Sequence, residues 1–91
     1  MRLHRTLVFA TIDSLDLIFN EQKQADKVLR STLKKDKRWG SRDRSFIAET
    51  TYDIVSWKRL YQEIEEVQSP FSRGNLYRMF AVWCTLKGIA I

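Results

Sequence analysis

The longest unbroken helical pattern in the chain covers residues 42–67, with the sequence RDRSFIAETTYDIVSWKRLYQEIEEV. Apolar side chains recur in it at three- and four-residue steps, so one face of a helix with about 3.6 residues per turn becomes apolar. The residues expected on this inward face are Phe46, Ile47, Thr50, Ile54, Val55, Trp57, Leu60, Tyr61 and Ile64. The pattern predicts one long helix, the longest element of the chain.

Three shorter helices are expected outside this segment, at residues 4–19, 25–35 and 76–87. Their inward residues are expected to be Leu3, Leu7, Val8, Ile12, Leu15, Ile18 and Phe19, then Val28, Leu29 and Leu33, then Leu76, Met79, Phe80, Trp83 and Leu86. The chain contains three Gly and one Pro, too few for the frequent turns of a sandwich or barrel. Its 91 residues have room for one domain, residues 1–91. We therefore expect an all-α bundle of about four main helices.

Particular residues mark where these helices begin and end. Gly40 is expected to take the positive φ of a turn, which leaves Ser41 as the N-cap of the long helix. Asn75 is expected to cap the last helix and Gly88 to stop it. Residues 34–35, both lysine, are expected to end the second helix, where the helix dipole favours cations.

The positive charge of the chain is concentrated in residues 27–44. The whole chain has a net charge of +5, whereas this segment has eight basic and two acidic residues, a net charge of +6. Its cations are Lys27, Arg30, Lys34, Lys35, Lys37, Arg38, Arg42 and Arg44. Concentrated positive potential attracts polyanions, and each phosphate that it neutralises releases counterions. The segment predicts a surface that binds RNA, although a run of Lys and Arg is equally typical of a solvated face.

Two further features bear on nucleic-acid binding. Trp39 lies among these cations and could stack on an unpaired base, a contact worth about 1–3 kcal/mol, or it could fill the bundle where the loop turns. Arg2, His4 and Arg5 form a smaller basic cluster at the start of the first helix. Cations there face the positive end of the helix dipole, a mildly unfavourable position that hints at a partner. Arg2 and Arg5 therefore join the candidate RNA contacts.

The residues that catalysis or metal binding requires are scarce. His4 is the only histidine and Cys84 the only cysteine, so a disulfide or a Cys/His metal cluster is not expected. No glycine-rich loop of the P-loop or Rossmann kind is present. Cys84 is expected to be a small buried hydrophobe. We expect no enzyme and no cofactor in this chain, no secretory signal or membrane span, and a reducing, cytoplasmic location.

Three polar residues, Glu49, Tyr52 and Asp53, interrupt the long helix at partly inward positions. Glu49 is expected to pair with a basic residue. Tyr52 is expected to bury its ring while its hydroxyl makes a hydrogen bond. These residues are predicted to anchor the long helix to its neighbours.

Residues 40–55, GSRDRSFIAETTYDIV, resemble the signature of the NusB-like domain at the N-terminus of the Sun/Fmu family of bacterial rRNA cytosine-C5 methyltransferases. In that family an Asp-Arg pair opens a helix, and an aromatic residue, an aliphatic residue, a Glu and a Tyr follow. The residues that fall in that order and spacing here are Asp43, Arg44, Phe46, Ile47, Glu49 and Tyr52. Residues 25–29 resemble the family's short second helix, so the resemblance covers roughly residues 3–60. Two positions depart from the pattern: Asp53 stands where Gly is common, and Ser56 where Arg is common.

This resemblance implies an all-α, NusB-like bundle that helps a methyltransferase hold 16S ribosomal RNA. The parent protein's catalytic domain, with its S-adenosylmethionine site, would lie C-terminal to this chain. Cys84 follows Trp83 and not Pro, so it does not match the family's Pro-Cys motif. The chain is also shorter than the family's domain, so we expect closing helices to be missing. The apolar residues Ile89 and Ile91 then favour self-association, for example a homodimer through the last helix.

Two other functions stay open on the sequence. NusB-like bundles also pair with proteins, so a protein-interaction module in transcription antitermination or assembly is the main alternative. A DNA-binding helix-turn-helix around residues 35–44 is the third, although the long helix that follows makes a poor recognition helix. A preference for duplex DNA over RNA would favour the third function, and self-association would favour the second.

Overall fold

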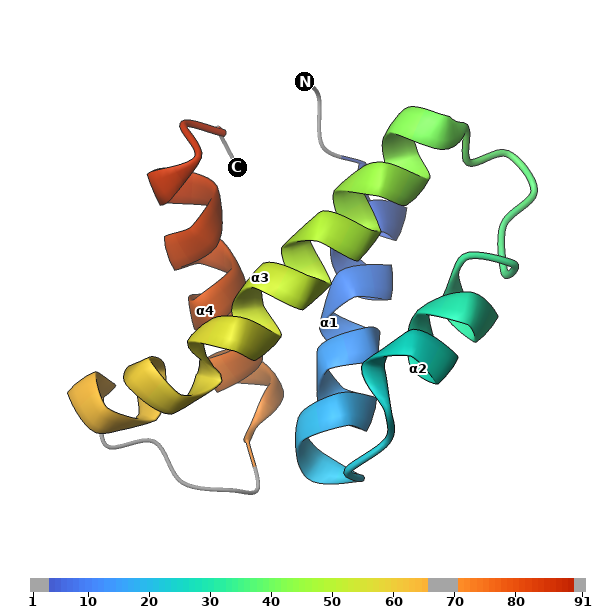
Figure 1. Cartoon of the computed structure of the whole chain (residues 1–91). Helices are drawn as coiled ribbons and strands as arrows, with labels where there is room; N and C mark the ends of the chain where they lie inside the picture. The colour runs from blue at the N-terminus through green and yellow to red at the C-terminus, as the bar shows by residue number, and fades with distance from the viewer. Residues whose placement is uncertain (1–3, 66–70, 90–91) are drawn as a thin grey trace.

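Four α-helices make up the chain where its structure is described. A computed structural model describes residues 4–65 and 71–89, with side chains at 4–57 and 71–89. The helices are α1 (Arg5–Asn20), α2 (Ala25–Thr32), α3 (Ser41–Glu65) and α4 (Arg73–Leu86) (Figure 1). No strand occurs in the two described ranges. The expected all-α bundle of four main helices is confirmed.

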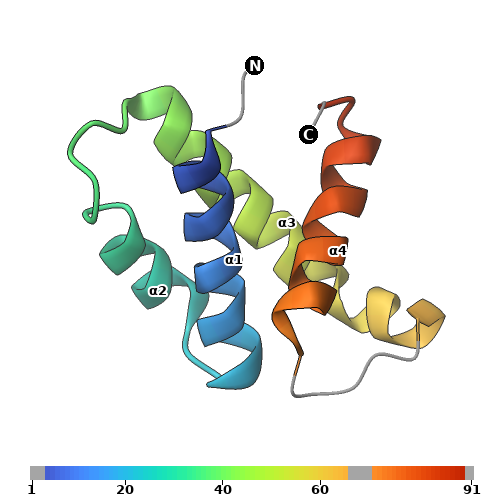
Figure 2. The same cartoon turned by 180° about the vertical axis from the view of Figure 1, so that it is seen from behind.

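Helix α1 lies at the centre of the bundle and contacts each of the other three helices. Helix α3 crosses α1, and α2 and α4 lie on opposite sides of α1 (Figures 1 and 2). Helix α3 also contacts both α2 and α4, whereas α2 and α4 do not contact each other through their described residues. The first turn of α1, the first turn of α3 and the last turn of α4 lie at the same end of the molecule (Figure 2).

The core gathers the inward faces that the sequence pattern predicts. Its completely buried apolar side chains include Leu7, Ile12, Leu15, Ile47, Ile54, Leu76, Met79 and Phe80. Between α3 and α4, the Phe46 ring lies edge-on to the rings of Trp83 and Phe80, with centroids 5.6 and 6.2 Å apart. The prediction that Leu86 faces inward is wrong, because 68% of its surface is exposed. The side chains of Leu3, Leu60, Tyr61 and Ile64 lie outside the described residues.

Helix α2 ends at Thr32 and not at residue 35 as predicted. The backbone N–H of Lys34 donates to Ser31 O at 3.3 Å, and that of Lys35 donates to Thr32 O at 3.0 Å. Bonds between residues three apart form a tightened turn that ends the helix. Both lysines therefore lie beyond the helix, and Arg30 is the cation of its last turn.

Helix α3 begins at Ser41, so Gly40 and not Ser41 is its N-cap. The Gly40 carbonyl accepts the backbone N–H of Arg44 at 3.1 Å, the first bond of the helix. The Asp43 carboxylate accepts the backbone N–H of Gly40 at 3.3 Å, as in one half of a capping box. The predicted positive φ of Gly40 is wrong, because an N-cap residue takes extended backbone; the described glycine with positive φ is Gly88, at 72°.

Helix α4 begins at Arg73, and its N-cap is Ser72, whose hydroxyl accepts the backbone N–H of Asn75 at 3.1 Å. The predicted cap, Asn75, therefore lies inside the first turn. A tertiary contact precedes this start: the Asn20 side chain accepts the Phe71 N–H at 2.5 Å and donates to the Phe71 carbonyl at 2.8 Å. This double hydrogen bond ties the end of α1 to the chain just before α4.

The predicted stop of α4 at Gly88 is confirmed. The Gly88 N–H donates to Thr85 O at 3.1 Å, and the Ile89 N–H donates to Cys84 O at 2.8 Å. These two bonds form a Schellman motif, in which the positive φ of Gly88 reverses the chain. Ile89 consequently packs against the core and is half-buried. Ile91 lies outside the described residues.

Asp53 and Glu49 connect α3 to the end of α4, as the anchoring prediction expects. The Trp83 indole N–H donates to Asp53 Oδ2 at 2.9 Å. Lys87 Nζ lies 3.7 Å from Asp53 Oδ2 and 4.0 Å from Glu49 Oε1. Lys87 Nζ also lies 5.8 Å from the centroid of the Trp83 ring, within the range of a cation–π contact.

Tyr52 anchors α3 on its other side, to α2. Its hydroxyl donates to the Asp26 carboxylate, and this bond raises the pKa of Tyr52. The prediction that the ring is buried is wrong, because 44% of Tyr52 is exposed. Ser14 and Thr32, both buried, join their hydroxyls at 3.0 Å and tie α2 to α1.

Candidate nucleic-acid interface

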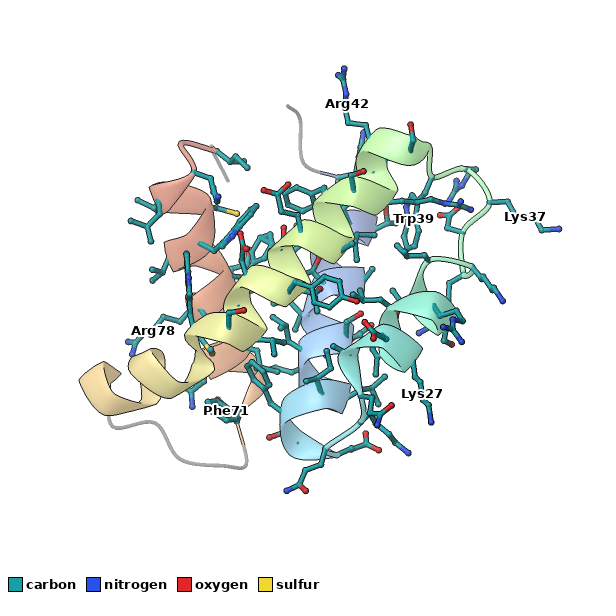
Figure 3. All side chains as sticks on the ribbon, in the orientation of Figure 1. Lys27, Lys37, Trp39, Arg42, Phe71 and Arg78 are labelled. Carbon is teal, nitrogen blue, oxygen red and sulfur yellow. The ribbon has the colours of Figure 1, made fainter. Side chains whose placement is uncertain are left out.

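Three cations form a row on the outer side of α2, called here the α2 row: Lys27, Arg30 and Lys34. Their spacing of three and four residues places them on one face of the helix and its terminal turn. Together with Ser31 they line an open depression of about 350 Å³. All four side chains are exposed, because the opposite face of α2 is buried against the bundle. Figure 3 shows Lys27 projecting away from the molecule.

The α2 row makes no ion pair with any described acidic residue. Asp26 is the only acidic residue of α2, and its carboxylate accepts the Tyr52 hydroxyl. The packing of α3 against α2 thus gives the Asp26 carboxylate a hydrogen-bond partner on α3. The three cations of the row outnumber the one carboxylate of α2, so this surface keeps a net positive potential towards solvent or an anionic partner.

The loop after α2 divides its cations into engaged and exposed ones. Arg38 makes a two-pronged pair with Asp36: Nε donates to Oδ1 at 3.0 Å, and Nη2 donates to Oδ2 at 2.9 Å. Hydrogen bonds from the Arg38 side chain and backbone lower the pKa of Asp36, and the carboxylate raises the pKa of Arg38. Lys35 and Lys37 are exposed and make no such pair with a described carboxylate. Arg38 is thus a weaker candidate for phosphate binding than the other loop cations.

Trp39 lies between the loop and the start of α1. It is half-buried and packs against the core, so the expectation that it fills the bundle at the turn is confirmed. It also lines a pocket of about 440 Å³, called here the Trp39 pocket. The other residues of this pocket are His4, Arg5, Thr6, Asp36, Arg38 and Asp43. One indole can therefore serve both the fold and a ligand.

Arg42 and Arg44 do not join the α2 row. Arg42 lines a separate, mostly apolar depression of about 250 Å³ between the start of α3 and the end of α4, with Lys87 and Ile89 among its neighbours. Figure 3 shows Arg42 projecting from the start of α3, whereas Lys27 and Lys37 project from the α2 side. Arg44 is exposed and lines neither this depression nor the Trp39 pocket. The predicted basic segment thus faces more than one direction.

The structure brings together two clusters that the sequence shows separately. Arg5, from the smaller N-terminal cluster, lines the same pocket as Trp39. Arg2, its predicted companion, lies outside the described residues. Asp43 also lines this pocket, although the sequence pattern suggests only a helix-start role for it. A charge plot cannot reveal this meeting, because it depends on how α1 and α3 pack.

The remaining chemistry of the described residues is limited. No three His, Cys, Asp or Glu side chains at 4–57 and 71–89 lie close enough together to hold a metal ion. Cys84 is completely buried, as predicted, and burial raises the pKa of its thiol. None of the helices, over the part described, is both long and apolar enough to cross a membrane. Comparisons with known protein families, curated proteins and solved structures give no match for this chain.

Proposed function

We propose that this chain is an RNA-binding domain whose α2 row contacts phosphates. The observation that carries the proposal is the row of Lys27, Arg30 and Lys34, exposed along one face and in no ion pair with a described carboxylate. Phosphate contacts of this kind supply most of the sequence-independent affinity for nucleic acid. Lys35 and Lys37 extend the positive surface into the loop.

Binding to RNA is favoured over binding to duplex DNA by the shape of the helices. A helix-turn-helix joins its two helices by a turn of roughly 3–4 residues. Here the connection spans residues 33–40, and the helix that follows, Ser41–Glu65, is embedded along the bundle and contacts α1, α2 and α4. An eight-residue connection does not have the length of that turn. The DNA-binding alternative is therefore ranked last.

The narrower form of the proposal is that the domain docks an S-adenosylmethionine-dependent rRNA cytosine-C5 methyltransferase on small-subunit rRNA. It is supported by the resemblance of residues 40–55 to the NusB-like domain of that family. In this form the chain supplies RNA contacts, and the cofactor and the methyl transfer belong to another part of the parent protein. No residue of this chain is assigned to catalysis.

The test is equilibrium binding to small-subunit rRNA fragments and to duplex DNA of equal length, across a salt series. We expect tighter binding to rRNA, with an affinity that falls steeply as salt rises. Unrelated structured RNA of the same length separates the narrow form from the broad one. Weak binding to all three, with no dependence on salt, would contradict the broad form.

A second candidate function, protein interaction, is favoured by exposed apolar side chains on α4. Val82 and Leu86 lie one turn apart on the same face of α4 and are 40 and 68% exposed. Exposed apolar patches are typical of surfaces that bind proteins. A solution mass that rises with concentration in the wild type, and stays monomeric in Leu86→Glu, would support self-association through α4.

A further inference from the structure

The Trp39 pocket has the size and composition of a site for a small planar ligand. Its volume of about 440 Å³ lies within the range of roughly 300–1,000 Å³ that small-molecule sites occupy. Its walls come from the first turn of α1, the α2–α3 loop and the start of α3. Trp39 is fixed by packing on the core, so its indole needs little ordering when a ligand stacks on it.

The hydrogen-bonding groups of the pocket favour a base over a bare phosphate. Two carboxylates, Asp36 and Asp43, line it together with two arginines, Arg5 and Arg38. Asp36 and Arg38 neutralise each other, which leaves one arginine and one carboxylate. A carboxylate in the pocket would repel a bound phosphate, because both are negatively charged. A site that binds phosphate alone is therefore not expected to contain one.

Asp43 and Trp39 have hydrogen-bonding atoms to spare. Asp43 Oδ2 accepts the Gly40 N–H, while Oδ1 has no donor among the described residues. The Trp39 indole N–H likewise has no acceptor in the part of the chain that is described. The pocket is thus lined by an indole and a carboxylate, each with a hydrogen-bonding atom that has no described partner.

We propose that the Trp39 pocket binds one unpaired nucleobase of the RNA, stacked on Trp39, with Asp43 reading its Watson–Crick edge. This rests on the proposed function and names the part of the RNA that the domain selects. Guanine fits better than cytosine or uracil, because its N1–H and N2–H groups lie side by side: one can donate to Oδ1 and the other to the second lone pair of Oδ2. Cytosine donates through its N4 amino group alone, and uracil flanks its single N–H with two carbonyls that the carboxylate repels. Arg5 contacts the phosphate next to the bound base.

The direct test is an NMR titration of the chain with guanosine, cytidine and uridine monophosphates, observed at the tryptophan indole N–H signals. We expect guanosine monophosphate to shift the Trp39 signal saturably, with cytidine monophosphate weaker and uridine monophosphate weakest. The signals of Trp57 and Trp83 serve as internal controls and should not move. No shift at Trp39, or equal shifts with all three nucleotides, would overturn the assignment.

Asp43→Asn isolates the base-reading role, because the amide oxygen can still accept the Gly40 N–H and cap α3. We expect the preference for guanine over uracil to fall by at least about fivefold, because guanine loses the carboxylate and uracil is no longer repelled by it. Arg5→Ala should lower the affinity for all three nucleotides by the same factor. The matched control is Lys23→Ala, an equal loss of charge on the exposed loop at the far end of α1. If Lys23→Ala lowers the nucleotide affinity as much as Arg5→Ala does, Arg5 does not contact the phosphate of the bound nucleotide.

Octamers of uridine with one central guanosine separate this inference from the proposed function. Arg30→Ala with Lys34→Ala should weaken binding to the octamer and to plain octauridine equally, leaving the guanine preference intact. Asp43→Asn should remove the preference and leave the salt dependence unchanged. Salt-dependent binding without any base preference would overturn the pocket alone. Suppose that guanosine monophosphate shifts the Trp39 signal but that Arg30→Ala with Lys34→Ala leaves the affinity for RNA unchanged. That result would overturn the proposed function alone.

Discussion

Trp83 and Trp39 both lie beside cations and carboxylates, but only one has its partners supplied by the protein. Trp83 is 2% exposed, donates its indole N–H to Asp53 and has Lys87 near its ring. Trp39 is half-buried, and its indole N–H has no acceptor among the described residues. Buried polar groups normally have hydrogen-bond partners within the protein, and the Trp83 indole N–H has one, so this arrangement stabilises the fold. The arrangement at Trp39 has groups available, and that difference separates a contact that holds the fold from one that can bind a ligand.

The largest effect should come from Trp83→Ala, which deletes a buried ring between α3 and α4. A loss of about 3–5 kcal/mol in the free energy of unfolding is expected, because a cavity replaces the ring and Asp53 loses its donor. Trp39→Ala should lower this free energy by less than about 3 kcal/mol, since the Trp39 ring is only half-buried. Urea denaturation followed by circular dichroism measures both. Equal losses would abolish the distinction between the two tryptophans.

An intermediate effect is expected at the start of α4, the helix that bears Trp83. Ser72→Ala removes the side chain that accepts the Asn75 N–H, so stability should fall by about 1 kcal/mol. Asn75→Ala keeps that N–H and should change stability by less than about 0.5 kcal/mol. The same denaturation experiment compares the two variants. The reverse order would place the cap at Asn75, as the sequence alone suggests.

The smallest effect concerns the loop that holds Trp39, through the pair of Asp36 and Arg38. The pKa of Asp36 is lowered from 3.8, so this carboxyl is protonated at a lower pH in the folded chain than in the unfolded chain. Its contribution to stability is therefore complete above pH ~3.8 and is lost as the pH falls through the lower, folded pKa. NMR titration of the Asp36 carboxyl carbon follows this directly. In Arg38→Ala the midpoint should rise towards the ordinary value without reaching it, because the backbone N–H of residue 38 still donates to Asp36. An unchanged midpoint would show that the Arg38 side chain is not its cause.

Periodicity was enough to predict the helices and most of the core, but not their ends. The buried positions of α3 from Phe46 to Ile54 follow the helical repeat. The start of α4 does not follow from local propensity, because Ser and Asn are comparable caps. The structure adds a hydrogen-bonded tie between Asn20 and Phe71, residues far apart in the sequence, which holds the chain just before Ser72.

The sequence predicts which segment is positively charged, but not which of its side chains lie on the same surface. Residues 27–44 stand out by composition, yet the structure directs Arg42 away from the α2 row and pairs Arg38 with Asp36. The meeting of Arg5 with Trp39 arises from the packing of α1 beside the loop, which no local pattern encodes.

The central claim is that the α2 row, and not the total charge of the chain, binds RNA. It is tested most directly by the salt dependence of RNA binding in Arg30→Ala with Lys34→Ala, compared with Lys23→Ala with Arg42→Ala. Both double variants lose two cations, but only the first removes them from the row. We predict that the slope of log affinity against log salt becomes shallower by about 1.4–1.8 in the row variant and by less than half of that in the control. An equal change in the two variants, or no change in the row variant, would contradict the account.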